Sequence, residues 1–247
     1  MDRLIYTAMG GASYLMQQQA AVAQNLANAN TPGYRAALNT FRAVPLVGEG
    51  LPTRTFVVDS TSGTDFSQGA LQATGSSLDV AIQGPGWIAL QMADGSEAYT
   101  RNGGFQVSAD RTLQTLNGIN VAGDNGPITI PPNTQITIGE DGTISTVPTG
   151  TQPIPATVVG RIKLANPPTA QIVRGDDGLF RTQDGKAAEA DANVILAPGN
   201  VESSNVSIVG AMVNMISLAR SYDMQTQLMT NADSNEKAAS SVLQVAS

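Results

Sequence analysis

Acidic residues and glycines come closest to known patterns of chemistry in this sequence. Asp176-Asp177, Asp184 and Glu189 could be paired carboxylates or part of a calcium loop. The spacing of an EF-hand loop is absent, and an Asp-Gly pair is explained by a hairpin turn alone. We therefore expect turns, and no metal ligands, from this group.

A second group of acids, Asp94, Glu97 and Asp110, could supply the carboxylate pair of a glycosidase. Nothing in their spacing selects them over the other acids. Trp87 could stack on a sugar ring, but it stands in an apolar stretch, which favours packing in a core. A secreted β domain that binds or hydrolyses cell-wall glycan through Asp110 or Trp87 is kept as an alternative.

Two glycine clusters, Gly84-Pro-Gly86 and Gly103-Gly104, invite comparison with phosphate-binding loops. No Gly-Lys-Ser/Thr sequence follows either cluster, and no helix is predicted to begin there. Turns explain both clusters better.

The chain of 247 residues contains no histidine and no cysteine. This excludes a Ser-His-Asp triad, a thiol nucleophile, a disulfide and a zinc site with His or Cys ligands. The net charge is −7 and the 13 basic residues are scattered, so a nucleic-acid partner is not expected. We therefore expect a protein that is not an enzyme, with no catalytic residue, no cofactor and no metal.

The ends of the chain carry the strongest structural pattern. Residues 4–34 contain no charged residue. Apolar and small residues follow alternating spacings of three and four, the pattern of interlocking helices, at Ile5, Ala8, Ala12, Leu15, Gln19, Val22, Leu26 and Ala29. Asp2 is a candidate N-cap. Pro32 and Gly33 predict a helix end near Asn28 to Asn30.

This first segment matches neither a membrane span nor a leader peptide. Its many Gln and Asn side chains are unsuited to a transmembrane helix, so no membrane insertion is expected. No cationic region precedes an apolar run and no small-residue cleavage site follows one, so no cleaved signal peptide is expected.

The first helix has little apolar surface to bury. Its pattern holds four large apolar residues, namely Ile5, Leu15, Val22 and Leu26. Burying them contributes roughly 8 kcal/mol, whereas ordering the helix costs on the order of 1 kcal/mol or more for each of its roughly 25 residues. We therefore expect this helix to be loosely held in the monomer and to fold fully on assembly.

The middle of the chain changes to a period of two. Short strands separated by Asp-Gly and Asn-Gly turns are predicted at residues 78–82, 87–92, 98–100, 105–107, 112–115, 128–130, 135–138, 143–145 and 158–164. Residues 35–76 lack a helical period, include a candidate strand at Phe56-Val-Val58, and predict an extended connector or hairpin.

Helical spacing returns near Ser203-Ser-Asn205, where Asn205 is a candidate N-cap. The second helical pattern consists of Ile208, Met212, Met215, Ala219, Tyr222, Met229 and Leu243. The expected fold class is α+β. Residues 1–34 and 203–247 form a coiled-coil-like helical domain, 35–76 the connector, and 77–202 a β-rich domain.

Three motifs in this order resemble the axial proteins of the bacterial flagellar rod and hook. They are Asn25-Leu-Ala-Asn-Ala-Asn-Thr-Pro-Gly-Tyr-Arg35, then Ser77-Leu-Asp-Val-Ala-Ile-Gln-Gly-Pro-Gly-Trp87 with Tyr99-Thr-Arg-Asn-Gly103, and Ser204-Asn-Val-Ser-Ile-Val209 leading to Ala219-Arg-Ser-Tyr222. Together they span nearly the whole chain. Residues 1–11 are most similar to the proximal-rod type within this family, and the distal rod or hook type is the near alternative.

The resemblance implies a structural subunit of the proximal rod, the driveshaft that crosses the periplasm in the flagellar basal body. It implies helical assembly with copies of itself and with other rod proteins, after passage unfolded through the flagellar export apparatus. The terminal helices are expected to form an inner tube and the β domain to face outward. The expected subunit interface comprises Ile5, Ala8, Ala12, Leu15, Val22, Leu26, Asn28, Pro32, Gly33, Tyr34, Ile208, Met212, Met215, Ala219, Tyr222, Met229 and Leu243.

Overall fold

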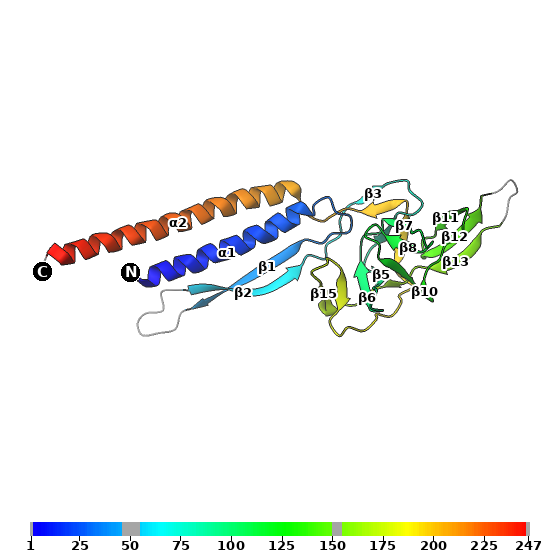
Figure 1. Ribbon diagram of the computed structural model, residues 1–247, viewed down its shortest axis with the longest axis horizontal. Helices are drawn as coiled ribbons and strands as arrows, with labels where there is room; N and C mark the ends of the chain where they lie inside the picture. Colours follow the sequence, from blue (N-terminus) through cyan, green and yellow to red (C-terminus); the bar gives the residue numbers. More distant parts are fainter. Residues whose placement is uncertain (1, 46–54, 150–154, 246–247) are drawn as a thin grey trace. The chain divides into compact units, whose positions relative to one another are not determined.

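The computed structural model describes residues 2–45, 55–149 and 155–245 (Figure 1). Within these residues the chain divides into two compact units. Unit 1 combines residues 1–29, 36–65 and 206–247, and unit 2 combines residues 30–35 and 66–205. The chain therefore passes between the units four times, and in this division the hairpin groups with the two helices.

Unit 1 consists of two helices and a hairpin. Helix α1 (Asp2–Ala27) runs antiparallel to helix α2 (Ile208–Val245) and contacts it along its length (Figure 1). The hairpin of β1 (Ala37–Pro45) and β2 (Thr55–Thr64) also packs against α1. Helix α1 thus has α2 on one side and the hairpin on another.

Specific contacts join α1 to the start of the hairpin. The Asn25 side chain donates to the carbonyl of Ala37 at 2.9 Å and accepts from its amide at 2.8 Å. The rings of Tyr14 and Phe41 meet edge to face with centroids 4.2 Å apart. These contacts fix the register of β1 against the helix.

Unit 2 is built from short antiparallel strands. Its largest sheet has nine strands, in the order β15-β16-β6-β5-β9-β8-β7 with β10 on β9 and β14 on β5. These strands are β5 (Trp87–Gln91), β6 (Glu97–Thr100), β7 (Phe105–Val107), β8 (Leu113–Thr115), β9 (Asn120–Gly123), β10 (Gly126–Pro127), β14 (Leu164–Ala165), β15 (Ile172–Arg174) and β16 (Phe180–Thr182).

Smaller sheets and one 3-10 turn complete unit 2. A three-stranded sheet holds β11 (Thr134–Ile138), β12 (Thr143–Pro148) and β13 (Thr157–Arg161). Two-stranded sheets pair β4 (Val80–Gln83) with β17 (Ile195–Pro198) and β3 (Leu71–Ala73) with β18 (Asn200–Glu202). The 3-10 turn η1 spans Thr169–Gln171. The α+β class is confirmed.

The core of unit 2 contains large aliphatic and aromatic side chains. Ile88, Leu90 and Leu113 are fully buried in one cluster, and Tyr99 is fully buried in a second. Trp87 belongs to the second cluster, where its ring lies 4.5 Å from that of Phe180, so the expected core packing of Trp87 is confirmed.

Two sequence predictions of local structure are wrong. Residues 128–130 form only an isolated antiparallel bridge, between Thr129 and Thr112, and not a strand; the carbonyl of Ile128 accepts from the amide of Leu113, and the amide of Ile130 donates to the carbonyl of Arg111. Asn205 does not cap α2. The Ser207 hydroxyl accepts from the amide of Gly210 and occupies that role.

Candidate functional site

The acids that suggested chemistry serve as turn supports. Asp94 accepts from the amide and hydroxyl of Ser96, and the hydroxyl hydrogen bond is the main cause that lowers the pKa of Asp94. Asp177 forms two hydrogen bonds with Arg181, at 3.0 and 2.6 Å, which lower the pKa of its carboxyl. Within the described residues no group of three or more acidic side chains is placed to hold a metal.

The residues proposed for glycan binding are not arranged for it. Trp87 is only 4% exposed, so its ring has no open face for a sugar. Asp110 lies in the turn between β7 and β8, where its amide donates to the hydroxyl of Ser108. The β5 strand places Trp87 inward, as the apolar sequence around it predicts.

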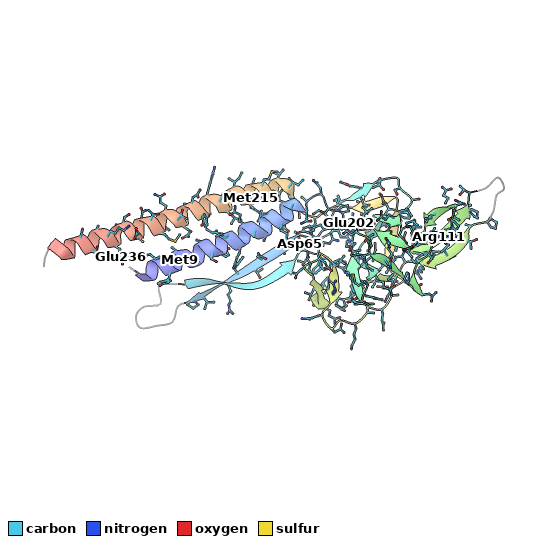
Figure 2. All side chains as sticks on the ribbon, viewed as in Figure 1. Met9, Asp65, Arg111, Glu202, Met215 and Glu236 are labelled. Atoms are coloured by element: carbon cyan, nitrogen blue, oxygen red, sulfur yellow. The ribbon has the colours of Figure 1, made fainter. Side chains whose placement is uncertain are left out.

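The least expected feature of unit 2 is a buried ion cluster at Glu202, the last residue of β18. Glu202 is labelled in Figure 2. One carboxylate oxygen lies 2.6 Å from Nη1 of Arg35, and the other lies 3.1 Å from Nη1 of Arg101. The Arg35 and Glu202 side chains are each 1% exposed. Two cations therefore share one carboxylate in the interior, an arrangement in which losing the carboxylate is costly.

Backbone and aromatic groups complete the surroundings of Arg101. Its Nη2 donates to the carbonyl of Gly84 at 2.7 Å, and its guanidinium lies 5.6 Å from the centroid of the Trp87 ring. Burial lowers the pKa of Arg101 to about 10, while Glu202 acts in the opposite direction. Arg101 is therefore charged at neutral pH despite its burial.

Arg35 is less completely satisfied. Its carbonyl accepts from Nη1 of Arg174, whose guanidinium lies 4.4 Å from the centroid of the Tyr34 ring. Its own Nε, Nη1 and Nη2 are buried and make no hydrogen bond among the described residues, so Arg35 and Glu202 form an ion pair by proximity alone. The contact with Glu202 is consequently the main compensation for burying the Arg35 charge.

The chain segments that lead from unit 2 into unit 1 are hydrogen-bonded to one another around Glu202. Gly33 donates to the Glu202 carbonyl at 2.8 Å, and Gly69 donates to its carboxylate at 2.9 Å. Asn205 donates from its amide to the carbonyl of Tyr34 and from its side chain to the carbonyl of Ser67. We call Arg35, Gly69, Arg101 and Glu202, with the segments 30–35, 66–69 and 202–205, the connector hub.

Glycine is required where the hub backbones approach closely. A Cβ on Gly33 would lie 2.3 Å from the amide nitrogen of Asn102, and the φ of Gly33 is +70°. A Cβ on Gly69 would lie 1.9 Å from the carbonyl oxygen of Ser203. Any side chain at these two positions would push the crossing segments apart.

The structure places the predicted interface residues in three settings. Ala8 and Ala12 are buried, and Ile5, Leu15, Val22, Leu26, Met215, Ala219, Tyr222 and Met229 are half-buried on the helices of unit 1. Ile208 and Met212 are exposed, at 39% and 50%. In unit 2, Gly33 and Tyr34 are buried and Pro32 is half-buried. Asn28 is half-buried just after α1, and the Leu243 side chain lies outside the described residues.

The inward face of α2 overlaps the predicted helical pattern in part. Buried and half-buried positions recur at Ala211, Met215, Leu218, Tyr222, Gln225, Met229 and Ala232. Met215, which is labelled on α2 in Figure 2, Tyr222 and Met229 are common to this register and the predicted one. The pairing with α1 is close, because a Cβ on Gly11 would lie 3.5 Å from the Gln225 side chain.

Among the unit 1 residues whose burial the structure describes, the fully buried hydrophobic side chains are small. In its described part the buried hydrophobic residues are Ala8, Ala12, Ala211 and Ala232. Exposed large apolar residues are found on both helices, and these include Tyr6, Met9, Met16, Val209, Val213, Ile216, Met224 and Leu228. These exposed side chains leave apolar surface on both helices that the described part of one chain does not cover. No described helix is apolar over a long enough stretch to cross a bilayer.

Three family models match the chain in order. Residues 5–35 match the flagella basal body rod protein, 81–146 the D1 domain of the flagellar hook protein FlgE/F/G, and 197–242 the C-terminal part of the flagellar basal body rod FlgEFG protein. Each ion-cluster residue falls in a different match: Arg35 in the first, Arg101 in the second and Glu202 in the third. This order of matches defines an axial protein of the flagellum.

Relatives across the full length agree. The flagellar basal-body rod proteins FlgF of Salmonella typhimurium and Escherichia coli are each 47% identical to the chain, over 98% of it and 99% of the relative. The flagellar basal-body rod protein FlgG of Buchnera aphidicola subsp. Baizongia pistaciae is 32% identical, over 86% of the chain and 88% of the relative. The chain belongs to the flagellar basal-body rod protein family. The resemblance to this family, and to its FlgF type, is confirmed.

The sequence analysis did not predict the connector hub, although its three charged residues lie in or near the motifs that carried the resemblance. Arg35 and Arg101 stand inside two of the motifs that carried the resemblance, and Glu202 lies two residues before the start of the third motif at Ser204. Residues 4–34 are uncharged and are followed by Arg35, and this isolated charge was the feature that could have indicated a buried ion pair. What the sequence lacked was any sign that the three charges meet.

Proposed function

We propose that the chain is a structural, non-enzymatic subunit of the flagellar proximal rod. It assembles helically through its terminal helices into the driveshaft that spans the periplasm and transmits torque. Full-length similarity to FlgF rod proteins supports this proposal. The observation that carries it is the alanine-only burial in the described part of unit 1, which leaves large apolar side chains available for neighbouring subunits.

The proposal assigns separate tasks to the parts of the chain. The helices, from residues 1–34 and 203–247, form the inner tube, residues 35–76 connect, and residues 77–202 form the outer domain. The 17 interface residues predicted from the sequence stay part of the proposal. Ile208 and Met212 support it most directly, because they are large, apolar and exposed in the single chain.

The proposed partners are copies of the chain, other rod proteins, and the flagellar export apparatus during secretion. The proposed location is the rod of the basal body in the periplasm, reached without a cleaved signal peptide. A first helix that has no charged residue after Arg3 and buries little by itself supports passage as an unfolded chain, because little stability has to be overcome in this segment. The mass of the chain recovered from purified basal bodies tests this, since an uncleaved chain keeps residues 1–34.

A charge on the helical unit tests the function. Cells that lack the native chain receive Leu26→Asp or, as a control in unit 2, Val158→Asp at a 64% exposed position on β13. We expect Leu26→Asp to abolish swimming and incorporation into basal bodies while the β unit stays folded, as reported by the fluorescence of Trp87. Val158→Asp should swim normally. Normal swimming and incorporation of Leu26→Asp would contradict the proposal.

A further inference from the structure

The first part of α2 carries a continuous exposed apolar surface. Val209, Met212, Val213 and Ile216 are 72%, 50%, 60% and 56% exposed, and we call them the α2 stripe. Spacings of three and four residues place them on one side of the helix, within about two turns. None of them belongs to the inward register that faces α1. A surface of this kind on a helix that is already paired on another side indicates a second packing partner.

The same unit also contains a groove without charged residues. It has a volume of about 380 Å³ and lies where α1, α2 and β1 meet. Its lining includes Val22, Asn25, Leu38, Asn39, Asn214 and Leu218. Leu38 is 47% exposed there, so the groove keeps apolar surface that the single chain does not cover.

The stripe and the groove lie at the same level of the helix pair. Asn214 and Leu218, which line the groove, are within a few residues of Val213 and Ile216 on α2. At 1.5 Å per residue the two surfaces are centred about 5 Å apart along the axis. They point in different directions, because Val213 and Leu218 are separated by roughly 140° around the helix. A neighbour placed side by side, with little axial shift, can therefore bring its stripe to this groove.

We propose that the α2 stripe of one copy packs into the groove between α1, α2 and β1 of the next copy. Both surfaces are uncharged, so their contact buries apolar area without removing an ion from water. The contact joins two different surfaces, so it is head-to-tail and repeats from copy to copy into a ring or helix. The pairing rests on the proposed rod function and specifies which surfaces of the helical unit meet.

Introduced cysteines test this pairing directly, because the chain has none of its own. Two differently tagged full-length variants, Val213→Cys and Leu38→Cys, are expressed together in cells that lack the native chain. Basal bodies are purified, treated with a short bis-maleimide, and examined for a dimer that carries both tags. We expect this dimer at ten or more times the level seen when Val158→Cys replaces Val213→Cys.

Other outcomes separate the pairing from the rod function. If the cells swim and both variants are in basal bodies, but the dimer does not exceed the Val158→Cys level, the pairing is wrong and the rod function stands. A stronger dimer between Met16→Cys and Leu38→Cys would assign the groove to the exposed face of α1 and would also overturn the pairing. Absence of the unsubstituted tagged chain from basal bodies would overturn both proposals.

Discussion

Glu202 and Arg101 are 101 residues apart in the chain, yet their side chains meet at 3.1 Å in the interior of unit 2. The second carboxylate oxygen of Glu202 lies 2.6 Å from Arg35. The Glu202 side chain, in the third family match, therefore contacts Arg35 in the first match and Arg101 in the second. The connector hub makes the folding of unit 2 depend on segments from near both ends of the chain.

Replacing Glu202 by glutamine should strongly destabilise unit 2. Two buried guanidinium groups would lose their shared counter-charge, and breaking a buried pair costs about 3–5 kcal/mol. Denaturant unfolding followed through Trp87, the single tryptophan of the chain and a core residue of unit 2, measures this cost. The matched control is Asp177→Asn, which breaks a surface pair with Arg181 and should cost about 1 kcal/mol or less. If the two variants lost the same free energy of unfolding, the ion cluster would not be a major source of the stability of unit 2.

Two glycines with the same backbone conformation should respond differently to alanine. Gly33 and Gly75 have φ values of +70° and +73°, but only Gly33 has neighbouring backbone where a Cβ would stand. Gly75→Ala should cost about 1 kcal/mol, from the left-handed conformation alone. Gly33→Ala should cost at least about 2 kcal/mol more, because the segment at Asn102 must move. Unfolding followed through Trp87 compares the two, and similar values would contradict the close crossing at Gly33.

The buried Tyr99 should titrate well above the ordinary pKa of a tyrosine. Burial raises the pKa of Tyr99 to about 12, and its hydroxyl donates to Glu97 at 3.0 Å. The folded state therefore favours neutral Tyr99. This contribution to stability is fully present below the ordinary pKa of 10 and is lost as the pH rises from 10 toward 12. An absorbance titration of tyrosinate in the folded protein should show a late step that is missing in Tyr99→Phe. If the two titrations coincide, Tyr99 is not buried in this way.

The two units should differ in hydrogen exchange when the chain is a dilute monomer. Amides of α1 from residue 5 to 27 should exchange quickly, because the buried hydrophobic residues in the described part of unit 1 are alanines. Amides of β5 should be protected, since Ile88, Ala89 and Leu90 are fully buried. Mass spectrometry of exchanged peptides resolves the two. Strong protection of α1 in the monomer would contradict folding on assembly.

The elements that the sequence predicted well are those with regular spacing. The 3-and-4 spacing from Ile5 to Leu26 and the return of helical spacing at Ile208 indicated both helices, and alternation indicated strands such as 105–107 and 135–138. Asp-Gly and Asn-Gly pairs marked turns correctly, for example at Gly95 and Gly118, which both have positive φ. These features are local, so the sequence carries them directly.

The features that escaped prediction depend on contacts between distant residues. Residues 128–130 alternate like a strand, and Ile128 and Ile130 lie in the core, but the pairing is limited to one bridge between Thr129 and Thr112 and to backbone hydrogen bonds with Leu113 and Arg111. Strands β17 and β18 pair with partners far along the chain, namely β4 and β3. The ion cluster combines single charges from three separate segments. No local sequence pattern predicts that these three charged side chains are in contact.

A density map of intact basal bodies, with this chain traced, tests the central claim most directly. We predict that α1 and α2 lie in the inner wall of the proximal rod, with the exposed apolar residues of α2 covered by neighbouring subunits. A map in which the chain lies outside the rod, or in which Val209, Val213 and Ile216 face solvent within it, would contradict the account.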